Sequence, residues 1–165
     1  MGRITEYLLL QQEPVAEALS RMQSDDATFA EAVKIWLDLL ARFPAGFKKQ
    51  HQVVVERSKD CLEDGVFLAA NLLHQMFGGS RLNETQRCAT RTQVETACGD
   101  PTSFTRILSR DPPFRNSDFD LNVPSSTWWR AGLRSGCPAR LPDLGLRFAS
   151  AVPTSAGLER QFSRL

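Results

Sequence analysis

The sequence lacks the long hydrophobic runs of a membrane protein: in its 165 residues, the longest uninterrupted apolar stretch covers only positions 66–70. Its first ten residues place Arg3 and Glu6 around a short leucine run, so no secretory signal peptide is expected. The four cysteines form no Cys-x-x-Cys pair, and the two histidines are too few for a zinc finger. These absences exclude a secreted or membrane protein and predict an intracellular chain with reduced thiols.

Signatures of catalysis and nucleotide binding are missing as well. The sequence has no G-x-x-x-x-G-K, G-x-G-x-x-G, G-x-S-x-G or H-E-x-x-H motif. His74 follows two leucines in an apolar segment and is expected to pack rather than to act as a base. Asp118 and Asp120 lie in a proline-bounded loop that offers too few oxygen ligands for a divalent cation. We therefore predict no metal site and no cofactor.

The formal net charge is only +1, but it is unevenly distributed. Residues 1–100 hold eleven basic and fourteen acidic residues, whereas residues 101–165 hold nine arginines and five acidic residues. Arginine suits phosphate contacts and buried ion pairs equally well. The excess of arginines over acidic residues in 101–165 gives a lower density of positive charge than a typical nucleic-acid-binding surface has. Direct DNA binding by this chain is therefore not expected.

Helical periodicity dominates the sequence, and no alternating strand pattern of useful length is present. One segment that ends before Pro44 has apolar residues every three or four positions: Phe29, Val33, Trp36, Leu40 and Phe43. Further helices are predicted over 14–22, from 47 onward, over 64–77 and 84–97, from 101 and from 142. The three valines at 53–55 leave a strand as the alternative for the helix predicted from 47 onward. A mostly α-helical, irregular array is therefore the predicted fold class.

Local signals set several of these helix boundaries. Asn83 and Gln86 have the spacing of a capping box at the start of the helix over 84–97, and Gly99 would end it. Gly78 and Gly79 would end the helix over 64–77 in the same way. Between residues 111 and 127 the prolines and turn-forming residues break any regular period, which predicts a long loop or linker.

The adjacent pair Trp128 and Trp129 follows that loop. Neighbouring residues on a helix point about 100° apart, so one flat face does not easily take both rings. One ring could pack internally while the other meets a second element, a partner chain or solvent. Alternatively, both rings could lie in one groove within the chain.

The C-terminal 38 residues carry a series of short motifs in a fixed order. They are Trp128-Trp129, Leu141-Pro142-Asp143-Leu144, Phe148-Ala149, Val152-Pro153-Thr154-Ser155-Ala156, Glu159-Arg160 and Phe162-Ser163. This series resembles the C-terminal dimerisation region of hAT-family transposases. A weaker likeness lies upstream, where Phe67 to His74 and Gly79 to Leu82 resemble a helical segment of that family, although Gln75 and Phe77 replace its proline and tyrosine.

The resemblance implies a fragment of an RNase H-like transposase. It divides the chain into residues 1–110, similar to the end of the family's helical insertion, a linker at 111–127 and the dimerisation motif at 128–165. Glu159 matches the family's catalytic glutamate, but the two strands that carry the partner aspartates are absent from this sequence, so no transposase activity is expected. The residues expected to anchor dimerisation are Trp128, Trp129, Leu144, Phe148, Leu158 and Phe162.

The family resemblance also implies a nuclear protein that pairs with itself or with another hAT-type protein. Two alternatives remain open at this point. The chain could supply Glu159 to a separate catalytic half of a DNA transposase, because such a site needs several carboxylates around its metal ions. It could also be a host-adopted nuclear regulatory or scaffold protein with a different partner.

Overall fold

The computed structural model describes residues 13–24, 27–43, 48–109, 111, 114 and 122–151. Every regular element in these ranges is a helix, which confirms the predicted mostly α-helical fold class. None of these helices has the length and apolarity needed to cross a membrane. The helices cover residues 13–22, α2 (Phe29–Arg42), α3 (Lys48–Leu62), α4 (Gly65–Leu73), α5 (Glu84–Cys98), α6 (Pro101–Leu108), α7 (Ser125–Arg134) and α8 (Arg140–Ser150).

Side-chain caps begin several of these helices where the sequence predicts them. The capping box of Asn83 and Gln86 forms at the start of α5, and Gly99 ends that helix with a φ of 64°. A second capping box, between Thr28 and Glu31, begins α2. The three valines near position 54 lie within α3, so the helical prediction is confirmed and the strand alternative is wrong.

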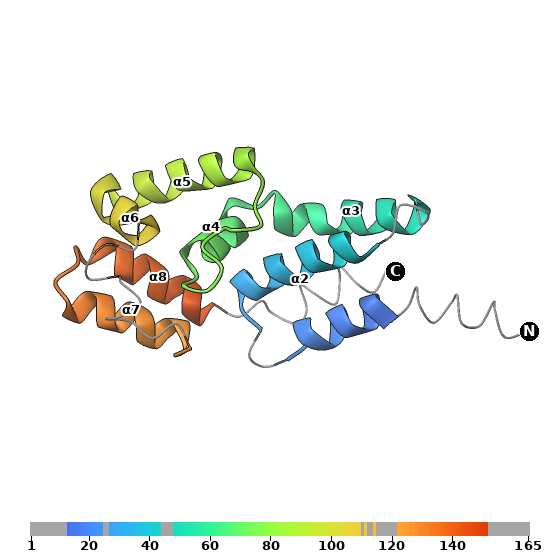
Figure 1. Cartoon of the computed structure of the whole chain (residues 1–165), viewed down its shortest axis with the longest axis horizontal. Helices are drawn as coiled ribbons and strands as arrows, with labels where there is room; N and C mark the ends of the chain where they lie inside the picture. Colours follow the sequence, from blue (N-terminus) through green and yellow to red (C-terminus); the bar gives the residue numbers. More distant parts are fainter. Residues whose placement is uncertain are drawn as a thin grey trace, which may run out of the picture.

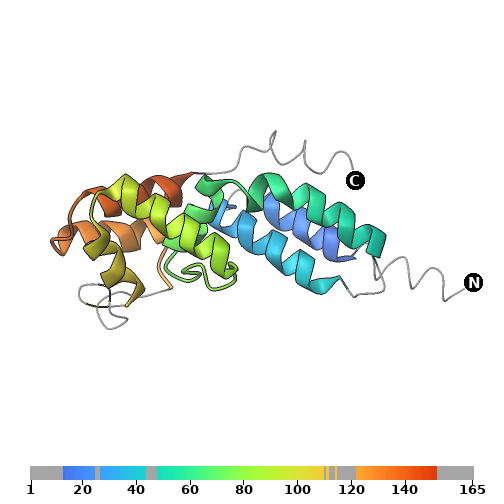
Figure 2. The same cartoon turned by 90° about the horizontal axis from the view of Figure 1, so that it is seen from above.

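The helices form two groups with α4 between them (Figure 1, Figure 2). The helix over 13–22, α2 and α3 surround the first core, and α5 to α8 surround the second. The first core consists of Ala18, Met22, Ala32, Val33, Ile35, Trp36, Leu39, Val54, Cys61, Leu62, Leu68 and Leu82. The second core consists of Ala69, Leu72, Leu73, Val94, Cys98, Phe104, Phe114, Trp128, Trp129 and Leu141.

Helix α4 joins the two cores because its neighbouring positions face opposite ways. Leu68 packs into the first core, whereas Ala69 and Leu72 pack into the second. The amide of Asn71, which is buried, donates a hydrogen bond of 3.0 Å to the Ala30 carbonyl of α2. The predicted C-terminal unit therefore shares its core with residues that precede the linker.

The helix predicted over 64–77 is shorter in the structure. Helix α4 ends at Leu73, and His74 has extended backbone with a ψ of 125°. The Asn71 carbonyl accepts hydrogen bonds from the N–H groups of His74 and Gly79, so the chain folds back on the helix end. This turn brings Leu82 into the first core, and the His74 carbonyl accepts hydrogen bonds from the N–H groups of Phe77 and Gly78 within the turn.

The boundaries near the predicted linker also differ from the prediction. Helix α7 begins at Ser125, inside the segment 111–127, and α8 begins at Arg140 rather than at Pro142. Within the described part of the linker, Phe114 is only 3% exposed and contacts both tryptophans. A hydrophobic side chain from this loop thus packs into the second core, and the regular structure of α7 starts within the segment predicted as a loop or linker.

Candidate protein-association surface

The tryptophan pair is enclosed by the chain itself. Trp128 and Trp129 are 4% and 1% exposed, and their rings meet edge to face with centroids 4.8 Å apart. The Phe114 ring lies 5.2 Å from the ring of Trp128. The second of the two arrangements predicted from sequence, with both rings in one intramolecular groove, is therefore the one that forms.

Two glycines allow α7 and α8 to approach closely around these rings. Gly145 of α8 lies directly against the Trp129 ring, where a β-carbon would overlap ring atoms. Gly132 of α7 faces Phe114, with ordinary contact distances for an added β-carbon. Since Trp129 fills the space beside Gly145, the tryptophans hold the two helices together and do not offer their rings to a partner in this conformation.

Leu144 and Phe148 have a different environment from the tryptophans. Both are half-buried, and both line an open groove of about 310 Å³ between α4, α5 and α8. The rest of the groove lining is mostly apolar, with Ala69 from α4 and Val94 and Ala97 from α5, but it also includes the polar Gln93 of α5. At its edge lies Val66, which is 48% exposed. We call this feature the α4/α5/α8 groove.

One acidic side chain lines the groove, and a basic side chain is exposed on α8, one of the helices that form it. Asp64 lines the groove on the α4 side, where its Oδ1 accepts a hydrogen bond of 2.7 Å from the Val66 N–H and caps the helix. On the α8 side, the exposed Arg147 lies one helical turn beyond Leu144. Each copy of the chain therefore has an acidic group in the groove lining and an exposed basic group on the adjoining helix α8.

Burial favours the uncharged forms of two titratable side chains, His74 and Cys98. Burial lowers the pKa of His74 to about 4, and the Glu31 carboxylate only partly opposes this effect. The His74 Nδ1 accepts a hydrogen bond of 3.2 Å from the Met76 N–H, and its ring stacks on Phe77 at 4.1 Å. Burial also raises the pKa of the Cys98 thiol. His74 is therefore a neutral packing residue at pH 7.

The four cysteines are all free thiols, with Cys61 and Cys98 buried. Across the described ranges, no three His, Cys, Asp or Glu side chains gather in a way that could hold a metal ion. Glu159, Leu158 and Phe162 lie outside the described residues, as do Asp118 and Asp120.

Sequence reasoning placed Leu144 and Phe148 on an association surface, and it missed the residues that complete the groove. Val66 stands out in the sequence only as the first residue of the longest apolar run. Thr90, Val94 and Cys98 recur every four residues, and this spacing marks the face of α5 that is buried. Comparison of the chain with family models, with curated protein sequences and with solved structures found no match.

Proposed function

We propose that this chain is a protein-association module related to the C-terminal dimerisation region of hAT-family transposases, and that it pairs with a second copy through the α4/α5/α8 groove. One observation carries the proposal. Leu144 and Phe148, two of the six residues that the resemblance assigns to dimerisation, line an apolar groove that no described residue fills. Open apolar surface of this kind marks interaction sites on otherwise soluble folds.

The charges at the groove favour a second copy of the chain as its occupant. Most homodimers are two-fold symmetric, so the same patch of both copies meets in the interface. Such a rotation can bring Asp64 of one copy close to Arg147 of the other, on either side of the apolar contact. Complementary charges of this kind set orientation and partner choice more than affinity.

The decisive experiment compares two matched valine substitutions. Val66→Glu places a charge in the groove, whereas Val53→Glu places the same charge on α3, where the valine is 41% exposed and lies outside the groove. Sedimentation velocity at micromolar to millimolar concentration should show dimers for the wild-type chain and for Val53→Glu, and monomers for Val66→Glu. A strictly monomeric wild-type chain contradicts self-association, and equal dimerisation of the two variants contradicts the groove as its site.

A second pair of variants tests the charges. Arg147→Glu places two acidic groups opposite each other across the proposed two-fold interface and should weaken the dimer. Arg130→Glu makes the same change at an exposed position of α7 and should leave the dimer intact. Because Asn also caps helices well, Asp64→Asn in the Arg147→Glu background keeps the α4 cap, removes the repulsion and should restore part of the affinity.

We further propose that the chain has no transposase activity of its own, because Glu159 is the only match to the family's three carboxylates. Transposition chemistry needs several acidic oxygens around divalent metal ions. Mg²⁺ or Mn²⁺ should then leave the melting temperature of the wild-type chain unchanged. The Glu159→Gln substitution should not change the melting temperature in the presence of either metal ion. Metal-dependent stabilisation that disappears in Glu159→Gln contradicts this proposal and favours the catalytic-subunit alternative.

A further inference from the structure

A second hollow, on the far side of α4 from the groove, combines positive charge with an apolar floor. It lies between α2, α4 and the turn that follows α4, and its volume is about 240 Å³. Lys34, Ser80 and Arg81 contribute its polar wall, and Leu37, Met76 and Phe77 contribute its apolar floor. We call it the Lys34/Arg81 pocket.

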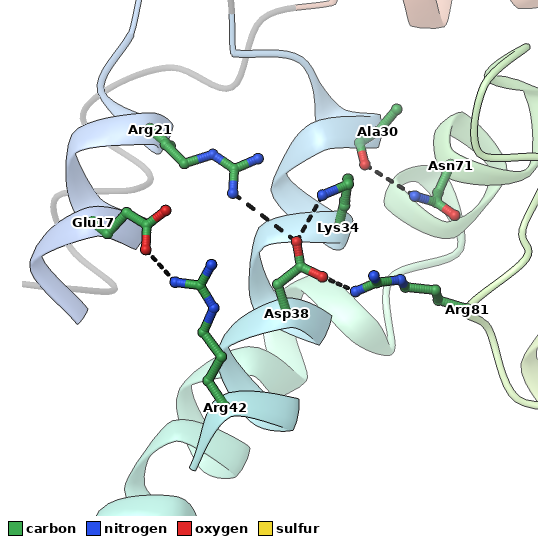
Figure 3. Close-up of polar contacts among 8 residues, drawn as sticks. All are labelled: Glu17, Arg21, Ala30, Lys34, Asp38, Arg42, Asn71 and Arg81. Carbon is green, nitrogen blue, oxygen red and sulfur yellow. Dashed lines mark hydrogen bonds and ion pairs between the residues drawn. The ribbon is translucent and has the colours of Figure 1, made fainter. Parts of the chain in front are cut away.

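The positive charge at this pocket exceeds the negative charge that balances it. Three cationic side chains converge on the single carboxylate of Asp38 (Figure 3). The Lys34 Nζ lies 2.7 Å from Oδ2 and the Arg21 guanidinium 4.0 Å from the same oxygen, while Arg81 pairs with Oδ1. Among the described residues, the ion pairs of these three cations, of which Lys34 and Arg81 line the pocket, thus all involve one carboxylate.

Two other described acids that interact with these cations have partners of their own. Glu17 pairs with Arg42, and Glu31 accepts hydrogen bonds from Thr28 in the capping box of α2. Burial, followed by the charges of Arg21, Arg81 and Arg42, holds the pKa of Lys34 below its usual range, although the Glu31 carboxylate opposes this. The described acids thus do not outweigh the mutual repulsion of these cations at Lys34.

The pocket walls are held in place by backbone contacts. The hydrogen bond from Asn71 to the Ala30 carbonyl fixes α4 on α2, as Figure 3 shows. Gly78 and Gly79, with φ of 51° and 66°, form the turn that carries Arg81, and the Gly79 N–H bonds to the Asn71 carbonyl. A ligand would therefore enter a site whose shape exists before binding, which lowers the ordering cost of binding.

We propose that the Lys34/Arg81 pocket binds a small organic anion. A carboxylate or phosphate head would take its hydrogen bonds from Lys34 and Arg81, and an aryl or short alkyl body would lie on Leu37, Met76 and Phe77. Lys34 and Arg81 both reach the carboxylate of Asp38, so their charges lie close together instead of forming a stripe, and the volume admits little more than one ring with its head group. Both features favour a discrete ligand over a nucleic-acid backbone, which needs an extended basic surface.

Phenyl phosphate is the probe for this proposal, with phenol and inorganic phosphate as controls that each lack one half of it. Titration followed by ¹⁵N–¹H NMR should show saturable shifts at residues 76–81 with phenyl phosphate. Phenol and inorganic phosphate should bind at least tenfold more weakly. Equal binding of inorganic phosphate contradicts the apolar part of the site, and no saturable binding of phenyl phosphate overturns the proposal.

Matched charge variants locate the site. The double variant Lys34→Gln/Arg81→Gln should lose about tenfold or more in affinity, because hydrogen bonds to charged groups are among the stronger polar contacts. Lys59→Gln/Arg106→Gln removes the same charge from exposed positions on α3 and α6 and should bind like the wild-type chain. Equal affinity of these two double variants overturns the proposal.

The competing carboxylate gives a test in the opposite direction. Asp38→Asn removes the acid that Lys34 and Arg81 now share, so phenyl phosphate should bind several-fold more tightly. If this variant fails to fold, the Lys34 ammonium of the wild-type chain offers a second measurement, because a bound anion favours its protonated form. A Lys34 titration that phenyl phosphate leaves unchanged contradicts the proposal.

Discussion

The two cores of this protein differ in composition and in the kind of surface that lies beside each of them. The first core is mostly aliphatic around Trp36, and the groove between the helix over 13–22 and α2 is bordered by the Glu17–Arg42 ion pair. The second core is aromatic, with Phe104, Phe114 and two tryptophans, and beside it lies the open α4/α5/α8 groove. The described border of the first core thus carries an ion pair, whereas the second core continues into open apolar surface of the kind on which the proposed self-association depends.

The largest effect on stability is expected from substitutions that remove the central tryptophan ring of each core. Trp36 and Trp129 are each no more than 1% exposed, so Trp36→Ala and Trp129→Ala should each reduce the free energy of unfolding by about 3–5 kcal/mol. Because α4 contributes to both cores, we expect one cooperative transition in each variant, measured by circular dichroism during urea denaturation. Two separate transitions would show that the cores fold independently.

Two glycine substitutions test how closely α7 and α8 pack in the second core. Gly145→Ala should destabilise the chain by about 1–3 kcal/mol, because the new methyl group overlaps the Trp129 ring. Gly132→Ala meets Phe114 at 3.4 Å, an ordinary contact, and should be neutral or stabilising by up to about 1 kcal/mol through helix propensity. Chemical denaturation of both variants checks this, and equal effects would contradict the close packing of α7 on α8.

The His74 imidazole predicts how stability depends on pH. Its folded-state pKa of about 4 lies below the ordinary value of about 6.5, so protonation favours the unfolded chain. Stability should therefore be fully present above pH 6.5 and decrease as the pH falls toward 4, by up to about 3 kcal/mol. His74→Gln should reduce this slope in thermal melts between pH 7 and pH 4, and an unchanged slope would contradict the assignment.

The smallest effect is expected at the ion pair beside the first core. Glu17 and Arg42 are both exposed, and solvent screens their attraction, although the Arg42 guanidinium lowers the pKa of Glu17. Arg42→Gln should leave the melting temperature and the oligomeric state nearly unchanged at physiological salt. A loss of dimer in this variant would place the interface on the first core rather than at the α4/α5/α8 groove.

Several helix ends could be predicted from sequence because their causes are local. The capping box of Asn83 and Gln86 and the stop at Gly99 depend on residues within one turn of each other, and they define α5 as predicted. The end of α4 could not be predicted in this way. It depends on the Asn71 carbonyl, which bonds to Gly79 eight positions later, and on the burial of Leu82 in the first core.

The sequence by itself determined that the chain is helical, because apolar spacing and side-chain caps act over a few residues. It also identified the tryptophan pair, Leu144 and Phe148 as the informative residues of the C-terminal segment. Only the tertiary structure decided their separate positions: packing against Phe114 and Gly145 enclosed both rings, whereas Leu144 and Phe148 came to face Val94 across an open groove. Such contacts join residues that are tens of positions apart, so they depend on how α4, α5 and α8 pack and not on any local pattern.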